Sequence, residues 1–377
     1  MSQMSEKLLF TPGPLTTSST VKQAALYDFG SRDQAFIQIV SDVRERIVRL
    51  ALADPAQYTC VLMQGSGTFG IEAVIGTVIP SDGKLLVAVN GAYGRRMARI
   101  AQLLRIPVVE CAGPENAPVD VTAVLKAVEA DSAITHVATC HVETTSGVLN
   151  DIERLGSQLR DRGTTFIVDA MSSFGGIPID VPRAGIDFLI TSSNKCIEGI
   201  PGFSVIVART DALRACEGNA RSLALDLLDQ YNYIESSGQF RFTPPTHAIL
   251  AFRQALDELD AEGGVQGRNQ RYRANHTLLC SEMARLGFKP FLDPAVRAPI
   301  ITSFHYPTHP SFSFKIFYDE LSERGLLIYP GKVSEAECFR IGNIGRLFEA
   351  DIRRLCAGIA EVLDSMGVDI PAEQDAS

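Results

Sequence analysis

Short apolar runs alternate with amphipathic stretches along most of the chain, from about residue 16 to residue 262. Leu85–Val89 and Phe166–Val168 are apolar at every position, which is typical of strands buried on both faces of a sheet. Between them, Asp120–Ala130 has the apolar spacing of a helix. Strands that alternate with helices predict parallel βαβ units. We therefore expect residues 16–262 to form a large α/β domain with a mostly parallel sheet.

The two ends of the chain depart from this alternation. Residues 1–15 include Thr11-Pro12-Gly13-Pro14, which disfavours a helix and predicts an extended N-terminal arm. After Gly263 we expect a long helix over Val265–Leu286, then shorter elements. These are strands over Ile300–Tyr306, Leu326–Tyr329 and Cys338–Ile341, and helices over Phe312–Arg324 and Phe348–Met366. Residues 263–377 are therefore expected to form a small α+β C-terminal domain.

Composition limits the class of protein to which the chain can belong. With 377 residues, 46% of them hydrophobic, the chain is long enough for a large core. A formal net charge of −9 argues against nucleic acid as a partner, since nucleic-acid binding normally needs a basic face. The 8 cysteines form no CxxC pair, so no metal site is indicated, and reduced thiols fit a cytoplasmic protein. No stretch approaches the ~18 apolar residues of a membrane span.

Two of the predicted strands lead to side chains suited to pyridoxal 5′-phosphate chemistry. Asp169 ends the run Phe166–Val168, and Lys195 follows Ile190–Asn194. Both are expected at the carboxyl edge of the sheet, where open α/β sheets bind ligands. A lysine amine forms a Schiff base with the cofactor aldehyde, and a carboxylate keeps the pyridine nitrogen protonated. Taken alone, Asp169 could cap a turn and Lys195 could be a solvated surface charge.

A glycine-rich segment after Cys60–Leu62 predicts a phosphate cradle. In Gly65-Ser66-Gly67-Thr68-Phe69-Gly70, glycines let the backbone approach an anion, and hydroxyls add donors at the start of a helix. The segment also fits the dinucleotide pattern GxGxxG, but the next strand ends in Asn90 rather than in the acid that binds a ribose. No lysine follows the second glycine, which excludes a P-loop.

Two further turns offer groups for a flat, polar cofactor. Tyr93 stands between Gly91 and Gly94 after a strand, where its ring could stack on a heterocycle. Thr144, in the turn His141–Gly147, offers a hydroxyl near the cofactor edge. Each segment alone is more often an ordinary turn, so the order of the motifs along the chain carries the inference.

This order resembles that of the fold type I aminotransferases. The motifs are GSGTFGIEA, NGAYG, HVETTSG, VDAMSSFGG and SSNKCIEGIPG. The chain is most similar to the alanine:glyoxylate aminotransferase branch. Within it, LLFTPGPLTTSSTVKQA, QFRFTPPTH and LLIYPGKVSEAECFRIGNIG resemble the 2-aminoethylphosphonate:pyruvate aminotransferases. The likeness runs from about Leu8 to about Leu363 and implies a seven-stranded-type, mostly parallel sheet in the large domain.

The resemblance also implies a role for each candidate residue. Lys195 would hold pyridoxal 5′-phosphate covalently, Asp169 would pair with its pyridine nitrogen, and Arg340 would clamp the acidic group of the substrate. The cofactor would further contact Ser66, Gly67, Thr68, Tyr93, Thr144 and Ser192, together with Thr243 of the partner subunit. A homodimer with shared active sites is therefore implied.

The implied reaction transfers the amino group of 2-aminoethylphosphonate to pyruvate, a step of phosphonate degradation. An alanine:glyoxylate or serine:pyruvate aminotransferase would share every cofactor residue and differ only around the substrate anion. A cysteine desulfurase is disfavoured because no cysteine lies in an obvious Gly/Ser-rich loop. A nucleotide-binding module without catalysis would leave Lys195 and Asp169 without a role. Arg32 departs from the phosphonate-using enzymes, which usually have Trp at that position.

Overall fold

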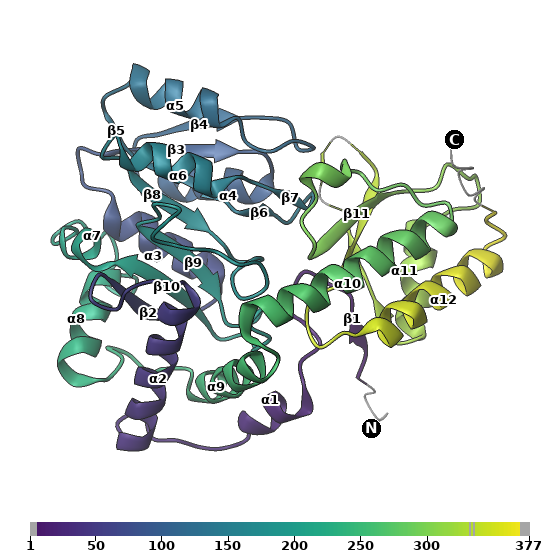
Figure 1. The fold of residues 1–377 in the computed structure, drawn as a ribbon, viewed down its shortest axis with the longest axis horizontal. Helices are drawn as coiled ribbons and strands as arrows, with labels where there is room; N and C mark the ends of the chain where they lie inside the picture. Colours follow the sequence, from purple (N-terminus) through teal and green to yellow (C-terminus); the bar gives the residue numbers. More distant parts are fainter. Residues whose placement is uncertain (1–5, 332, 335, 370–377) are drawn as a thin grey trace.

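A seven-stranded sheet forms the centre of the larger part of the molecule (Figure 1). The structure is a computed structural model that describes residues 6–331, 333–334 and 336–369. In spatial order the strands are β2 (Tyr58–Gln64), β10 (Phe203–Arg209), β9 (Phe188–Ser192), β8 (Thr165–Asp169), β5 (Ile134–Cys140), β3 (Lys84–Val89) and β4 (Val108–Ala112). β10 runs antiparallel to both neighbours, and the other pairs are parallel. The expected mostly parallel sheet is confirmed.

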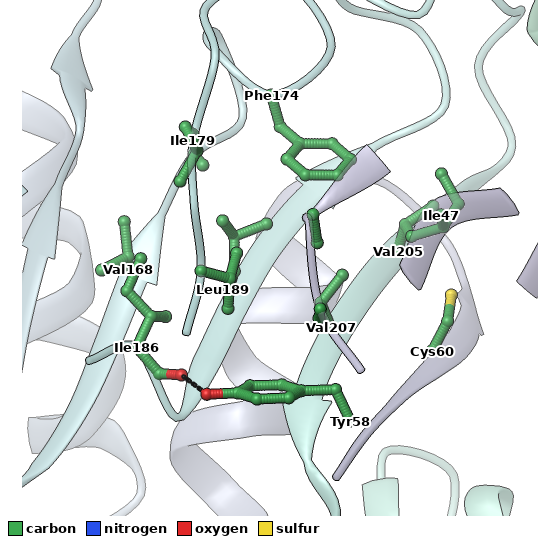
Figure 2. Close-up of a cluster of buried hydrophobic side chains, with 14 of the residues drawn as sticks. Ile47, Tyr58, Cys60, Val168, Phe174, Ile179, Ile186, Leu189, Val205 and Val207 are labelled. Carbon is green, nitrogen blue, oxygen red and sulfur yellow. Dashed lines mark hydrogen bonds between the residues drawn. The ribbon is translucent and has the colours of Figure 1, made fainter. Parts of the chain in front are cut away.

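The strands bury side chains on both faces of this sheet. Cys60 and Leu62 of β2 belong to one buried cluster, whereas Val61 and Met63 belong to a second. Successive side chains of a strand point to opposite faces, so an all-apolar run requires a cover on each. Figure 2 shows part of the first cluster, where the Tyr58 hydroxyl also donates to a backbone carbonyl oxygen. A ligand therefore reaches this sheet at the ends of its strands.

Helices cover both faces (Figure 1). The first cluster receives side chains from α2 (Gln34–Leu50), α5 (Val121–Ala130), α6 (Ile152–Arg160) and α9 (Thr246–Ala261). The second receives them from α3 (Gly67–Val78), α4 (Ala92–Leu103), α7 (Thr210–Arg214) and α8 (Leu227–Ser237). Aspartate carboxylates accept hydrogen bonds from the first-turn amides of α2, α5, α6 and α8. By contrast, α3 begins without a side-chain cap, which leaves its first turn available to a ligand. The first-turn amides of α4 donate instead to a carboxylate from another segment, that of Glu143.

The C-terminal residues form a separate layer (Figure 1). Its elements are α10 (Gly264–Arg285), η1 (Pro294–Val296), β11 (Ile301–His305), α11 (Phe314–Glu323), β12 (Leu326–Leu327), β13 (Tyr329–Pro330), β14 (Cys338–Gly342) and α12 (Glu349–Ser365). β11, β14 and β13 form an antiparallel sheet. The remaining elements are β1 (Leu8–Leu9), α1 (Ser19–Ala24), β6 (Val142–Glu143) and β7 (Val148–Leu149).

The N-terminal arm joins this C-terminal layer. β1 pairs in parallel with β12, and Phe10 is fully buried in the C-terminal core. The prediction of one strand over Leu326–Tyr329 was therefore wrong, because its two halves pair with different partners: β12 pairs with the arm and β13 with β14. The long helix after Gly263 and the strand over Ile300–Tyr306 are confirmed with small shifts at their ends. The division into an arm (1–15), a large domain (16–262) and a small domain (263–377) stays a prediction.

Among the described residues, no helix combines the length and the apolar character that crossing a membrane requires.

Candidate active site

A cavity of about 200 Å³ opens at the carboxyl edge of the central sheet. It lies where β8 and β9 end and where α3 and α4 begin, the position at which open α/β sheets bind ligands. The lining residues are Ser66, Gly67, Thr68, Ile71, Tyr93, Arg96, Val142, Thr144, Asp169, Met171, Ser172, Ser192, Asn194 and Lys195. The fold thus brings together eight of the ten residues proposed for catalysis or for binding cofactor and substrate.

Lys195 follows β9 and is enclosed by the N-terminal arm. Its ammonium group donates a hydrogen bond to the carbonyl oxygen of Pro12. A Cβ atom added to Gly13 would lie only 2.7 Å from the lysine Nζ, so the arm passes this close because position 13 is glycine. Burial lowers the pKa of Lys195 to about 8, although Cys196 and Asp169 oppose the shift. A neutral amine, able to act as nucleophile or base, is therefore accessible near neutral pH.

Asp169 is the last residue of β8 and faces the same cavity. One carboxylate oxygen accepts a hydrogen bond from the Met171 amide at 2.9 Å, and Cys140 Sγ lies 3.8 Å from the other. Burial raises the pKa of Asp169 to about 6, partly offset by the Met171 amide. Such a carboxylate would be stabilised by a cation placed opposite it, such as a protonated ring nitrogen.

The first turn of α3 forms the predicted cradle. Ser66 is the N-cap, but its hydroxyl makes no hydrogen bond to the helix, so it is available to a ligand. A Cβ atom on Gly67 would lie 2.3 Å from Met171 Sδ, so a side chain at this position would have to displace the end of the Met171 side chain. The free amides and the positive end of the helix dipole favour an anion here.

Tyr93, Thr144 and Ser192 complete the wall of the cavity. The backbone amide of Tyr93 donates to a carboxylate oxygen of Glu143 at 3.1 Å, which fixes the start of α4. Thr144 and Ser172 share a hydrogen bond of 2.6 Å between their hydroxyl oxygens. Ser192 is buried at the end of β9. The flat ring and the hydroxyls expected from the sequence therefore face one space.

Arg340 lies on β14, beside the cavity rather than in its wall. Its side chain is almost fully buried, and its guanidinium donates to the carbonyl oxygens of Pro330 and Thr144, each at 3.0 Å. Within the described part of the chain no carboxylate lies within ion-pairing distance of Arg340. Its charge lowers the pKa of Lys195, although burial is the larger cause. A buried cation without an acidic partner is suited to an anionic substrate.

Two other predicted residues are not part of this cavity. Thr243 is exposed, and its carbonyl oxygen accepts a hydrogen bond of 3.3 Å from the side chain of Gln64. Gln64 is the last residue of β2 and directly precedes the cradle segment. Arg32 is also exposed and lies two residues before α2. Neither side chain lines the site of its own chain.

Sequence reasoning missed two charged residues at the site. Glu143 is completely buried and also accepts a hydrogen bond from the Thr145 hydroxyl at 2.6 Å. Its signal was present, since an acid occurs in the otherwise uncharged stretch Val142–Leu149. Arg96 lines the cavity three residues after Tyr93, a spacing that puts both on one face of α4. A helical projection of α4 could have found it.

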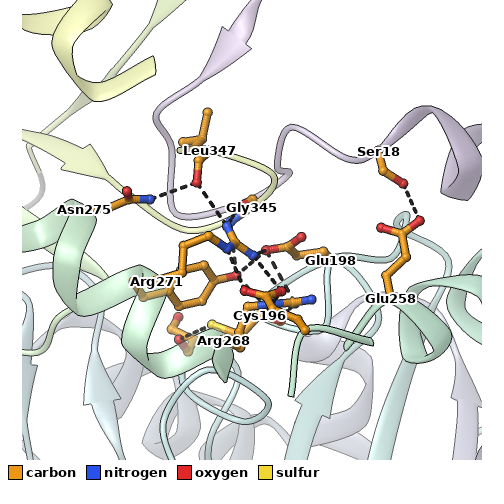
Figure 3. Close-up of polar contacts among 12 residues, drawn as sticks. Ser18, Cys196, Glu198, Glu258, Arg268, Arg271, Asn275, Gly345 and Leu347 are labelled. Atoms are coloured by element: carbon orange, nitrogen blue, oxygen red, sulfur yellow. Dashed lines mark hydrogen bonds and ion pairs between the residues drawn. The ribbon is translucent and has the colours of Figure 1, made fainter. Parts of the chain in front are cut away.

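A buried network of charges supports the segment after Lys195 (Figure 3). Arg268, on α10, donates to the carbonyl oxygen of Cys196 at 2.6 Å. Arg271, one turn later, donates to Glu198 at 2.8 Å and to the Gly345 carbonyl oxygen at 2.6 Å. Gly345 follows β14, the strand of Arg340, so α10 links the lysine segment to the arginine segment.

Comparison with known proteins places this geometry in a family. The aminotransferase class-V model matches residues 18–334. The 2-aminoethylphosphonate–pyruvate transaminase of Bacillus cytotoxicus is 51% identical over 94% of this chain and 97% of its own length. The protein of the same name from Vibrio vulnificus is 51% identical over 95% of this chain and 98% of its own length.

Solved structures share the fold at lower identity. Ureidoglycine-glyoxylate aminotransferase from Bacillus subtilis matches with a TM-score of 0.90 at 22% identity, covering 98% of this chain and 96% of that chain. Alanine–glyoxylate aminotransferase from Nostoc sp. matches with a TM-score of 0.88 at 23% identity, covering 96% of both chains. The fold expected from the sequence motifs is therefore confirmed, and the chain belongs to the class-V aminotransferase family.

Proposed function

We propose that this aminotransferase uses pyridoxal 5′-phosphate to transfer the amino group of 2-aminoethylphosphonate to pyruvate, giving phosphonoacetaldehyde and L-alanine in phosphonate degradation. The observation that carries the proposal is that the partly buried Lys195 and the buried Asp169 face one cavity beside an anion cradle. Relatives that match nearly the whole chain at 51% identity bear the name of this reaction.

The residues of the cavity fit the cofactor. Ser66, Gly67 and Thr68 would hold its phosphate. Tyr93 would stack on its ring, and the Asp169 carboxylate would accept a hydrogen bond from its protonated ring nitrogen. Thr144 and Ser192 would contact its polar edge. When bound, the cofactor supplies an aldehyde that takes up the amino group and a ring that accepts an electron pair. The uncapped start of α3 is evidence of fit, because its free amides and the Ser66 hydroxyl, which makes no hydrogen bond to the helix, offer donors to a phosphate.

Lys195 would move the proton in this reaction. The pKa of its amine is lowered to about 8, so a neutral amine that can accept a proton from the substrate carbon is present near neutral pH. The carbonyl oxygen of Pro12 orients the nitrogen. The N-terminal arm, which carries Pro12 and Gly13, limits access of water to that atom.

Arg340 would bind the acidic group of each substrate in turn. A planar guanidinium can fork to a phosphonate in one half-reaction and to a carboxylate in the other. Its hydrogen bonds to Pro330 and Thr144 hold the group in place before the substrate arrives. One cation beside one cavity therefore suffices for both half-reactions.

The proposal extends to a homodimer in the cytoplasm. Thr243 is exposed next to the cradle region without lining it, which fits a residue that serves a second copy. The cysteines of the chain are free, as expected in a reducing compartment.

A panel of amino donors tests the substrate assignment. With pyruvate as acceptor, 2-aminoethylphosphonate should give alanine faster than serine or glycine does. An alanine:glyoxylate or serine:pyruvate aminotransferase is the alternative, and preference for those donors or for glyoxylate would establish it instead.

A lysine variant tests the mechanism. Lys195→Ala should abolish transamination while the fold survives, because it removes the amine and little core volume. Lys315→Ala is the control, since that lysine is exposed and pairs with Asp319 on the surface of α11. Borohydride reduction of the parent should fix the cofactor to a peptide containing residue 195. Turnover near the parent rate in Lys195→Ala would contradict the assignment.

A further inference from the structure

We propose that Arg96 is a further binding residue of this site, whose guanidinium holds the phosphate of the cofactor together with Ser66 and Thr68. The inference rests on the proposed function, because it requires a phosphorylated cofactor. It assigns a role to a cation that neither the motifs nor the family comparison identified.

The position of Arg96 points to the cradle. It lies on α4, three residues after Tyr93, and its guanidinium carbon is 4.8 Å from the centroid of the Tyr93 ring. Its Nη1 donates to the Thr68 hydroxyl at 3.3 Å, and the side chain lines the cavity beside Ser66 and Gly67. The N-terminal part of α4 thus presents a cation to the first turn of α3.

The charge of Arg96 has no acidic partner within ion-pairing distance in the described ranges. The neighbouring Arg95 pairs with Glu115, and the buried Arg268 pairs with Glu198 and Glu262. Arg96 is partly buried, so leaving its charge unpaired costs free energy unless an anion arrives. Its charge also favours the ionised form of Asp169, as one of the smaller causes acting on the pKa of that carboxyl.

A doubly charged phosphate needs more than the cradle alone provides. Hydroxyls and helix amides supply partial charges, whereas a guanidinium supplies a full positive charge and parallel donors. Substrate phosphonate has the same chemistry, but Arg340 holds the side of the cavity near Thr144 and Arg96 holds the side near Thr68. The two arginines lie on two sides of the cavity and therefore match two anions. Arg340 is assigned to the acidic group of the substrate and Arg96 to the phosphate of the cofactor.

Binding of two aldehydes to the cofactor-free protein tests this assignment. Pyridoxal 5′-phosphate and unphosphorylated pyridoxal are titrated by absorbance into the parent, Arg96→Met, Arg96→Lys and the control Arg99→Met. Arg99 is on the same helix but exposed, and its guanidinium donates a hydrogen bond to Gln102. We expect Arg96→Met to lower the affinity for the phosphorylated aldehyde roughly 10- to 100-fold. Arg96→Lys should lower it less, because lysine keeps the charge. Pyridoxal should bind all four proteins alike.

Each other result has a distinct meaning. Equal losses of affinity for both aldehydes would overturn the proposal and show that Arg96 acts by packing against Tyr93. Unchanged cofactor affinity with a raised KM for 2-aminoethylphosphonate would overturn it in favour of the substrate phosphonate. Thermal unfolding of the cofactor-free variants separates misfolding from lost binding, and Arg96→Lys keeps the test decisive if Arg96→Met does not fold. If the parent binds the cofactor as expected but does not transaminate, the proposed function fails while the role of Arg96 stands.

Discussion

Burial acts in opposite directions on the two ionisable groups that face the cavity. It lowers the pKa of Lys195 to about 8 and raises that of Asp169 to about 6, because a desolvated group favours its neutral form. The lysine is thereby prepared to work as a neutral amine. The carboxylate instead gains from any cation that enters the cavity, which links cofactor binding to its ionisation.

Asp169→Asn should reduce transamination several hundredfold while the protein still binds some cofactor. An amide cannot neutralise a protonated ring nitrogen, and breaking a buried ion pair from one side costs about 3–5 kcal/mol. Steady-state rates of alanine formation measure the effect. A rate within about tenfold of the parent would rule out the proposed pairing, since that is a barrier change of only ~1.4 kcal/mol.

The same carboxyl predicts a pH dependence of cofactor affinity. In the cofactor-free protein Asp169 is ionised above a pKa of about 6. A bound cation lowers that pKa, so the extra affinity is complete above pH 6 and is lost as the pH falls below it. Titrations of the parent and Asp169→Asn between pH 5 and pH 8 should diverge toward higher pH. Parallel curves would show that Asp169 does not face the cation.

Arg340→Lys should slow both half-reactions, because the same guanidinium is proposed to hold phosphonate and carboxylate. Lysine keeps the charge but loses the fork, at a cost on the order of 1.5–3 kcal/mol. Arg32→Ala should lower mainly the rate of the half-reaction with 2-aminoethylphosphonate. Single-turnover rates with 2-aminoethylphosphonate and with L-alanine measure each half. Unchanged rates in Arg340→Lys would show that Arg340 does not bind the substrate anion. Equal losses of rate with both donors in Arg32→Ala would show that Arg32 does not select for the phosphonate.

At the scale of elements, α10 fixes the position of the Lys195 segment relative to β14, the strand that carries Arg340. Arg268 is fully buried and donates to Glu262 and to the carbonyl oxygen of Cys196, the residue after Lys195. Arg271 contacts Glu198 and the loop after β14. This helix therefore fixes the lysine segment and the strand of Arg340 against each other.

Arg268→Met should lower the free energy of unfolding by about 3–5 kcal/mol. The variant keeps an apolar stem but leaves Glu198 and Glu262 with one buried partner fewer. Urea unfolding of the cofactor-free protein measures the change. Arg285→Met, an exposed position on the same helix, should change stability by less than about 1 kcal/mol. Equal effects of the two substitutions would mean that the buried network adds nothing.

The sequence predicts some elements of this fold well and others poorly, for physical reasons. Runs such as Leu85–Val89 are apolar throughout because both faces of the sheet are covered, and that pattern is local. The split of residues 326–330 into β12 and β13 depends on an arm more than three hundred residues earlier, so no local pattern encodes it. Lys195 and Asp169 end readable strands, whereas Arg96 acts from the face of a helix whose orientation only the fold determines.

At the scale of the whole molecule, two exposed aromatic side chains lie in the segments that form or adjoin the cradle. Phe69 on α3 and Phe242 beside Thr243 expose 52% and 45% of their surfaces. Gln64 ties the 242–243 segment to the end of β2. Exposed apolar groups next to a binding site are typical of a surface that another protein covers.

We expect the active form to be a dimer in which Thr243 of the partner subunit completes the cradle. Sedimentation velocity at assay concentration should show a dimer, and Thr243→Ala should weaken cofactor binding roughly tenfold or more, the effect of one hydrogen bond to a charged group. A fully active monomer would contradict the shared site.

Mixed dimers decide which subunit each Thr243 serves. A heterodimer of Lys195→Ala and Thr243→Ala chains contains, if the sites are shared, one site with both native residues, because the intact lysine of one chain meets the intact threonine of the other. That site should bind cofactor with the affinity of the parent and show half of its activity. If Thr243 instead serves its own chain, every intact lysine is paired with alanine at position 243. The heterodimer would then keep the weak affinity of the Thr243→Ala homodimer, because no exchange of chains could restore the missing hydroxyl.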